Sequence, residues 1–377
     1  MIVDKIDFVL LSNILLGIFA LSLLLQCWFY LRVFSRLAFY KKKDTSLDTP
    51  PVSVIICARN EDDNLKSFIP FIMQQNYPDF EVVVVNDCSY DNTGEILEEL
   101  SKKYNNLKIV TIKEDDHFSH GKKFALMLGI KGAKNEHLLL TDADCIPSSP
   151  DWIKCMMSEF REDAEIVLGY GAYEKKSGFL NKIIRFDTYF IALQYLSYSL
   201  IGKTYMGVGR NLAYKKSLFF KMKGFASHYH IESGDDDLFV NEAATKRNST
   251  IEVAIASHTV SNVKTTFKTW VNQKRRHITT AKHYNVASKF RLGLLSLSQY
   301  LFFVSLILLL VFKIQVLVII SLFVFRLLLQ MIIFKKSMDK LNESDLWPIS
   351  FIMELVLLVV YPIVFVSNLF VKKHQWR

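Results

Sequence analysis

The chain has 377 residues, of which 51% are hydrophobic, and its formal net charge is +9. One soluble domain does not need so much apolar sequence, so we expect a globular domain combined with membrane segments. The positive charges gather beside the apolar runs, from Arg32 to Lys43 and from Lys274 to Arg291, as cytoplasmic flanks of membrane helices do. This placement disfavours a nucleic-acid binder as the reason for the charge.

The first apolar run, from Phe8 to Leu31, has no charged residue and is long enough to cross a hydrocarbon layer of ~30 Å as a helix. Acidic residues precede it and basic residues follow it, unlike in a cleaved signal peptide, so residues 1–34 are predicted to be an anchor that leads into the cytosol. Two further runs predict a transmembrane hairpin in residues 292–334, and residues 346–371 predict a C-terminal transmembrane segment.

Four crossings would leave the basic end of the chain, Lys372, Lys373 and Arg377, on the outer side, against the positive-inside tendency. One run is therefore alternatively re-entrant or interfacial. Arg326 and Glu354 interrupt the apolar runs, and they either mark a polar path between helices or pair with each other.

Residues 50–285 are predicted to form the soluble domain. Four short apolar, β-branched runs alternate with stretches of helical spacing, and this order predicts an α/β fold with a mostly parallel sheet. Ligands of such sheets bind outside the carboxyl ends of the strands. The four predicted strands are Val52 to Cys57, Glu81 to Asn86, Lys108 to Ile112 and His137 to Thr141.

Acidic residues follow these strands. Asp142 and Asp144 leave the fourth strand two residues apart, so their side chains share a face and are suited to bind one Mg²⁺ or Mn²⁺ ion. The alternative is a solvated turn. Further on, Glu232 to Asp237 contains four carboxylates, which either raise one another's pKa to give a general base or form a solvated acidic loop. Gln273 to His277 offers cations for phosphate oxygens, besides marking the membrane flank.

Two other stretches are candidates for a ligand-binding surface. Gly207 to Asn211 is rich enough in glycine for a close approach of the backbone to a ligand, and a plain turn is the alternative. Phe179 to Leu200 carries aromatic residues at helical spacing, which suit an aromatic platform for a ligand, an interfacial helix or a core helix.

Together these motifs resemble the family 2 inverting glycosyltransferases, the group that includes cellulose, chitin and hyaluronan synthases. The resemblance spans Pro51 to His277 and includes flanking membrane helices. The motifs that carry it, in chain order, are Val54 to Glu61, Asn86 to Ser89, Gly121 to Leu126, Asp142-Ala143-Asp144, Gly234-Asp235-Asp236 and Gln273-x-x-Arg276.

The resemblance implies a nucleotide-diphosphate-sugar glycosyltransferase fold flanked by transmembrane helices, and it implies roles for particular residues. The catalytic base is Asp236, or Asp235 if the motif is read one residue earlier. Asp144 binds the metal and Asp142 contacts the donor or the metal. Donor or nucleotide contacts fall on Ala58, Asn60, Glu61, Asp87 and Lys122, and contacts to the diphosphate and acceptor fall on Gln273, Arg276 and His277. His277 stands where the family usually has Trp.

The implied function is transfer of a hexosyl group, with inversion and Mg²⁺ or Mn²⁺, from a nucleotide sugar to a glycan or lipid acceptor hydroxyl. UDP is the expected nucleotide, and the expected location is the bacterial plasma membrane, with the catalytic domain in the cytosol. A second reading is a non-catalytic subunit that binds nucleotide sugar within a polysaccharide assembly complex. Single addition and processive extension both stay open, as does an oligomer or an export partner.

Overall fold

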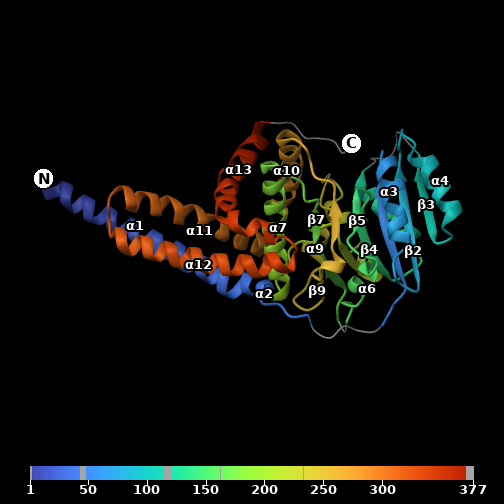
Figure 1. The fold of residues 1–377 in the computed structure, drawn as a ribbon, viewed down its shortest axis with the longest axis horizontal. Coiled ribbons are helices and arrows are strands. Elements are labelled where there is room, and N and C mark those ends of the chain that lie inside the picture. Colours follow the sequence, from blue (N-terminus) through green and yellow to red (C-terminus); the bar gives the residue numbers. More distant parts are fainter. Residues whose placement is uncertain (1, 43–47, 114–120, 162, 232, 371–377) are drawn as a thin grey trace.

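A computed structural model gives the fold and describes residues 2–42, 48–113, 121–161, 163–231 and 233–370. Three long helices project from an α/β domain, and a layer of further helices lies between the two parts (Figure 1). Several residues considered above lie outside the described part of the chain: Lys43, Glu232, Val371, Lys372, Lys373 and Arg377.

The α/β domain is built on a seven-stranded sheet in the order β3-β2-β1-β4-β8-β6-β9. The strands β1 to β4 pair in parallel, so the predicted mostly parallel α/β arrangement is confirmed. β1 lies between β2 and β4 and is buried along nearly its whole length, which explains its continuous apolar sequence. The bounds of these strands are β1 Val52–Ala58, β2 Phe80–Asp87, β3 Leu107–Ile112 and β4 His137–Asp142.

The rest of the sheet mixes directions. β8 pairs antiparallel with β4 and β6, and β9 pairs parallel with β6. A second sheet has the order β5-β10-β7. These strands are not predicted from sequence, because runs of three or four residues carry too little periodicity. Their bounds are β5 Cys145–Pro147, β6 Ile166–Leu168, β7 Gly171–Tyr173, β8 Leu212–Lys215, β9 Ser249–Ile251 and β10 Thr259–Ser261.

Helices cover both faces of the large sheet. α3 and α4 pack with alternate residues of β1 and β2 in one core, whereas α5 packs with the intervening residues in the other. Gly129 of α5 approaches the sheet so closely that a Cβ there would lie 2.9 Å from methyl groups of Ile55 and Val85. The helices of the domain are α3 Asp62–Met73, α4 Thr93–Lys103, α5 Lys122–Gly132, α6 Trp152–Met157, α8 Lys216–Lys221 and α9 Asp237–Ala243.

Three further helices stand between the sheet and the long helices: α7 Phe179–Leu200, α10 Phe267–Ala281 and α13 Ser350–Phe370 (Figure 1). The aromatic side chains of α7 that include Phe186, Tyr189 and Tyr198 are buried in the main core. The core interpretation of this stretch therefore holds for most of its aromatic residues.

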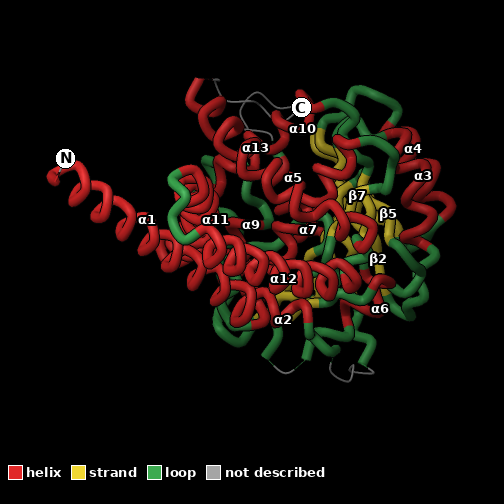
Figure 2. The backbone as a smooth tube through the Cα atoms, turned by 60° about the vertical axis from the view of Figure 1, so that its left-hand side comes forward, coloured by secondary structure: helices red, strands yellow, loops and turns green. Residues whose placement is uncertain are grey.

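Four helical stretches are long and apolar enough to cross a membrane: Phe8–Ala38, Val286–Val311, Val316–Lys340 and Ser344–Asn368. The first consists of α1 Ile2–Trp28, a π-helical turn Phe29–Phe34 and α2 Ser35–Ala38. The second and third are α11 and α12, which pack side by side with α1 (Figure 2). The fourth joins a 3₁₀ segment, Ser344–Ile349, to α13.

Arg326 of α12 and Glu354 of α13 pair with each other, with 2.6 Å between Nη2 and Oε1, and both are buried. Gln330 also donates to Glu354, and Arg326 donates to Gln26 of α1. The charges thus satisfy each other inside the bundle, as buried ions must. Of the two alternatives for these residues, the structure shows the pair.

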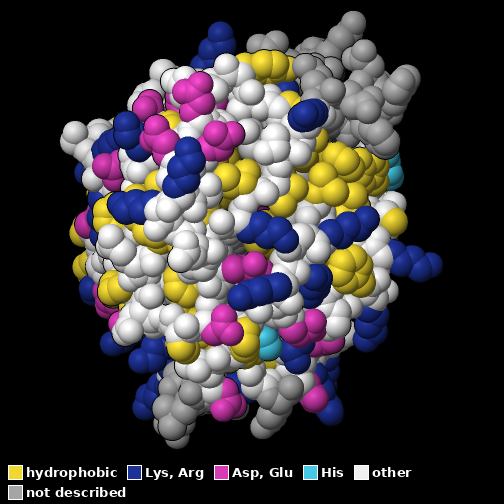
Figure 3. Space-filling model, turned by 90° about the vertical axis from the view of Figure 1, so that its right-hand side faces the viewer, with side chains coloured by type: hydrophobic (Ala, Val, Ile, Leu, Met, Phe, Trp, Pro, Cys, Tyr) yellow, Lys and Arg dark blue, Asp and Glu magenta, His cyan; other side chains and the backbone are white. Residues whose placement is uncertain are grey.

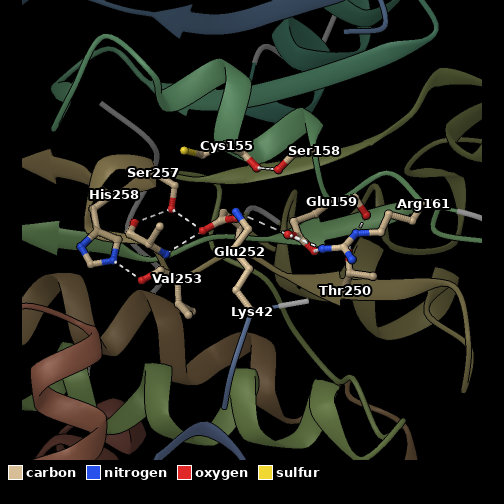
Figure 4. A network of polar contacts seen from close by, with 11 residues as sticks. Lys42, Cys155, Ser158, Glu159, Arg161, Thr250, Glu252, Val253, Ser257 and His258 are labelled. Atoms are coloured by element: carbon tan, nitrogen blue, oxygen red, sulfur yellow. Dashed lines mark hydrogen bonds and ion pairs between the residues drawn. The ribbon is translucent and has the colours of Figure 1, made fainter. Parts of the chain in front are cut away.

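A second polar network ties the segment after α2 to the α/β domain (Figure 4). Lys42 forms ion pairs with the buried carboxylates of Glu252 and Glu159. Arg161 also pairs with Glu159, at 3.0 Å. Each buried carboxylate thus has a cation as its partner. Because Lys42 follows the first long helix, its ion pairs hold the start of the domain close to that helix.

The face of the domain remote from the long helices carries Lys, Arg, Asp and Glu side chains of both signs, with small apolar patches between them (Figure 3). This surface contrasts with the long helices, where many large apolar side chains are exposed, among them Leu24, Leu31, Ile307, Leu317 and Leu328. A charged surface on the domain and an apolar surface on the long helices are expected when the domain faces water and the helices face lipid.

Candidate active site

Lys122 connects three motifs that lie far apart in the sequence. It is the first residue of α5, and its ammonium group lies 2.8 Å from Asp142 Oδ1 and 3.0 Å from Asp235 Oδ2. The parallel strands bring the start of α5 and the end of β4 to one edge of the sheet. The structure therefore brings together the predicted donor residues Lys122 and Asp142 with the acidic segment before α9.

The side chains of Asp142, Asp144 and Cys145 place one potential ligand atom each within 4.8 Å of the others. Burial, and then the charge of Asp142, raise the pKa of Asp144, which shows that cations of the protein compensate this carboxylate only in part. Two carboxylates that share a cavity suit a hard cation such as Mg²⁺ or Mn²⁺. The Cys145 thiol is hydrogen-bonded to Ser261. Its burial, followed by the charge of Asp144, raises its pKa well above the usual range and makes it a poor ligand.

The three consecutive aspartates have different partners. Asp235 pairs with Lys122, and Asp237 accepts hydrogen bonds from the hydroxyls of Thr280 and Tyr284. Asp236 caps α9 and accepts from the backbone N–H of Asp237 at 2.7 Å and from that of Gly209 at 2.6 Å. Within the described part of the chain, the hydrogen bonds to Asp236 thus come from backbone N–H groups alone.

Asp236 is the acidic residue best suited to exchange a proton near neutral pH. Burial, followed by the negative charges of Asp235 and Asp237, raises its pKa to about 7. Lys122 and the Gly209 N–H oppose that rise. Burial also raises the pKa of Asp237, but the hydroxyls of Thr280 and Tyr284 hold its carboxylate in place.

The predicted diphosphate and acceptor residues lie on α10. Gln273 donates a hydrogen bond of 3.0 Å to the hydroxyl of Tyr173. Arg276 is exposed, and it lines the cavity in whose wall Asp142 also lies. His277 also lines this cavity. The three residues thus face the acidic cluster from the helix that closes its other side.

The residues predicted to hold the nucleoside form the neighbouring edge of the sheet. Asn60 accepts a hydrogen bond from the N–H of Tyr90, and the N–H of Glu61 donates to Thr93, so the loops after β1 and β2 are bound together. Glu61 lines the cavity, whereas Ala58 and Asp87 are buried at the ends of their strands and, like Asn60, do not line it.

Two residues of the site are missed by the sequence analysis. Arg210 stacks on Tyr173, with its guanidinium 4.3 Å from the ring centroid, and both line a hollow of about 330 Å³ with Asp142 and Asp144. The charge of Arg210 adds to that of Lys122 in lowering the pKa of Asp142, and it opposes the rise in the pKa of Asp144. The feature of the sequence that could have identified Arg210 is its position as a cation within the glycine-rich stretch from Gly207 to Asn211.

The larger cavity has a volume of about 840 Å³. Lys122, Asp144 and Asp236 lie in its wall with Arg276, so it contains the candidate metal ligands, the candidate base and cations together. This arrangement can bind an anionic leaving group and remove a proton from a nucleophile in the same space.

Comparison with known proteins agrees with these features. Residues 53–222 match the family model described as Glycosyl transferase family 2. A poly-beta-1,6-N-acetyl-D-glucosamine synthase of Staphylococcus epidermidis is 30% identical over 152 residues, which cover 40% of this chain and 35% of the synthase. An uncharacterized glycosyltransferase of Haemophilus influenzae is 32% identical over 136 residues, which cover 35% of this chain and 40% of that protein. The matched part of the chain thus spans less than half of the length of either relative.

Among solved structures, a mannosyltransferase of Pyrobaculum calidifontis in complex with GDP-Man and Mn²⁺ superposes with a TM-score of 0.57 at 18% identity. The superposition covers 92% of this chain and 99% of that chain, and it shows a common fold. The predicted nucleotide-sugar glycosyltransferase fold is therefore confirmed, and residues 53–222 contain a domain of the family 2 glycosyltransferase type.

Proposed function

We propose that the protein is a membrane-bound inverting glycosyltransferase. It moves a sugar from a nucleotide-diphosphate sugar to an acceptor hydroxyl at the cytosolic face of the bacterial plasma membrane. The observation that supports the proposal is the double ion pair of Lys122 with Asp142 and Asp235, because it joins two of the proposed donor residues to the segment that contains Asp236. Membrane attachment is supported by the four long apolar helices.

In this proposal Asp236, not Asp235, is the general base. The ion pair with Lys122 occupies the carboxylate of Asp235, whereas burial and the neighbouring negative charges raise the pKa of Asp236 to about 7. At neutral pH Asp236 is therefore ionised in much of the protein and is basic enough to accept a hydroxyl proton. The deprotonated oxygen then attacks the anomeric carbon from the side opposite the diphosphate, so the configuration inverts.

The leaving diphosphate requires positive charge. Lys122, Arg210 and Arg276 line the cavity around Asp142 and supply it from three different elements. Mg²⁺ or Mn²⁺, held by Asp142 and Asp144, would add Lewis-acid stabilisation of the diphosphate oxygens. UDP is the proposed nucleotide, a choice consistent with the polymer made by the matched synthases, whose names specify N-acetyl-D-glucosamine.

The test is nucleotide release by the detergent-purified protein from a panel of UDP-, GDP- and dTDP-sugars, with Mg²⁺ or Mn²⁺ and with chelator. We expect release from one donor that depends on the metal and is lost in Asp236→Asn. Donor binding without release from any member of the panel, in the presence of membrane lipids, would instead support the non-catalytic subunit.

A further inference from the structure

The cavity of the candidate active site continues from the acidic cluster to the membrane helices. Beyond Asp236, its wall passes Tyr205 and Tyr284 and reaches the first part of α11 and the second half of α13. The chemistry of the wall changes along this path from charged to largely apolar. The residues that line its far part include Leu292, Leu295 and Ser296 of α11 and Leu358, Pro362 and Phe365 of α13.

The cavity does not continue along the bundle to the other side of the membrane. Gln299 lies in its wall and donates a hydrogen bond of 3.0 Å to Glu354, which is held by the buried Arg326. The hydroxyl of Tyr300 also donates to the carbonyl of Leu358, so α11 and α13 are joined there. In the described part of the chain no residue of α1 or α12 lines the cavity. Its far part therefore ends between α11 and α13.

Both ends of α13 are attached to the α/β domain. Before its start, Asp345 accepts a hydrogen bond of 2.6 Å from Arg185 of α7. Near its end, Ser367 accepts a hydrogen bond of 2.8 Å from Arg275 of α10. Tyr361, between them, donates to Asp187 of α7. Because α7 packs against the strands β7 and β9, these contacts favour a helix that lies along the domain over one that crosses the membrane.

The orientation of α13 agrees with these contacts. Figure 1 shows α13 beside α7 and α10 and steeply inclined to the long helices α1, α11 and α12. Its outward residues Ile352, Val359, Ile363 and Val366 are exposed and apolar, while Met353 and Val364 are buried. An apolar outer face on a helix that lies along the domain suits a position in the membrane interface.

We propose that the far part of this cavity binds a membrane lipid and that the acceptor hydroxyl belongs to the head group of that lipid. This inference rests on the proposed function and names its acceptor. The lipid enters sideways between α11 and α13, its chain lies against Leu292, Leu295 and Phe365, and its head group reaches Asp236. An apolar wall formed by α11 and α13 favours a hydrocarbon chain over a sugar chain, whose hydroxyl groups need hydrogen-bond partners.

The proposed transfer needs only the lipid hydroxyl, Asp236 and the nucleotide sugar. The lipid hydroxyl gives its proton to Asp236 and its oxygen bonds to the anomeric carbon. The bond between that carbon and the diphosphate oxygen breaks, and the nucleoside diphosphate leaves with the electron pair. The product is a glycolipid that can leave between α11 and α13 without release into water.

The experiment uses the full chain in nanodiscs of phosphatidylethanolamine and phosphatidylglycerol that contain a phospholipid with a photoreactive group in its acyl chain. Labelled residues are located by mass spectrometry. Ser296→Trp fills the cavity from α11, and Leu297→Trp is the matched control, since Leu297 is the next residue of the same helix, is 54% exposed and does not line the cavity. Because Ser296 is also exposed, neither change disturbs the core. Ser296→Leu is a second, smaller change in the same direction.

We expect label on Leu292, Leu358 or Phe365 in the original protein and in Leu297→Trp, and about a tenfold decrease in Ser296→Trp. Label that is absent from these residues, or equal in Ser296→Trp and the original protein, overturns the lipid site.

With the donor that reacts in the nucleotide-release assay, labelled sugar should enter the organic phase on extraction. Sugar recovered only in a water-soluble polymer overturns the lipid acceptor but leaves the proposed function standing. Cavity labelling in a protein that binds no nucleotide sugar would instead mean that the proposed function has failed.

Discussion

Replacing Asp236 by Asn should abolish transfer without unfolding the protein. The carboxylate accepts backbone hydrogen bonds from Asp237 and Gly209, and an amide oxygen can accept one of them in the same place. What the substitution removes is the ability to take up a proton. Loss of a general base costs about 10²- to 10⁴-fold in rate, so kcat should fall by that factor while the affinity for the donor changes little.

The pKa of Asp236 gives the expected pH dependence. Because its carboxyl must be ionised to act as a base, kcat/KM of the original protein should rise with pH through about 7. The increase from 3.8 to about 7 corresponds to a penalty of roughly 4 kcal/mol on the charged form in the folded state. That penalty lowers the stability of the folded protein as pH rises from about 4 to 7. Asn cannot ionise, so Asp236→Asn should be at least as stable as the original protein at pH 8.

The assays are nucleotide release between pH 5 and 9 and thermal unfolding in detergent at pH 5 and pH 8. Asp237→Asn is the matched control, because the same chemical change there disturbs the hydrogen bonds from Thr280 and Tyr284. We expect it to lower the melting temperature and to retain nucleotide release within about tenfold. Full activity of Asp236→Asn, or a rise through pH 7 that survives in it, would refute the assignment of the base.

Three other perturbations test separate parts of the structure. Asp144→Asn removes one of the two proposed metal ligands, so the Mn²⁺ concentration for half-maximal release should rise roughly tenfold or more; an unchanged midpoint would exclude Asp144 as a ligand. Arg326→Met leaves Glu354 buried without its cation and should cost about 3–5 kcal/mol of stability, part of which returns when Glu354→Gln is added. Unfolding in detergent measures this, and equal stability of the single variant and the original protein would contradict it. Finally, green fluorescent protein fused after Arg377 should fluoresce and alkaline phosphatase fused there should be inactive, since an interfacial α13 keeps this end in the cytosol; the opposite pair of results would favour a fourth crossing.

Several features of the site could be predicted because they depend on local sequence. The apolar runs of β1 and β4 predict buried parallel strands, and parallel strands carry Asp87, Asp142 and Asp144 to one edge of the sheet. The motifs around Lys122 and Asp236 then identified the family. Neither inference requires knowledge of which side chains touch.

Contacts between distant segments could not be predicted in this way. Reading the acidic motif left both Asp235 and Asp236 as candidates, and the proposal of Asp236 depends on the position of Lys122, which contacts Asp235 across 113 positions of the chain. The place of Arg210 beside the proposed metal ligands likewise depends on its stacking with Tyr173.

The sequence by itself determined the fold class, the family and the amount of apolar helix. The tertiary structure decided which partners each of the three aspartates has, how Arg326 is neutralised and which helices α13 contacts. The physical reason is that hydropathy and periodicity report the polarity of a segment, whereas the charge state of an aspartate and the direction of a helix depend on its neighbours in space. Residues 346–371 are apolar enough for a crossing, and the proposed interfacial position of α13 rests instead on the contacts of Arg185 and Arg275 near its two ends.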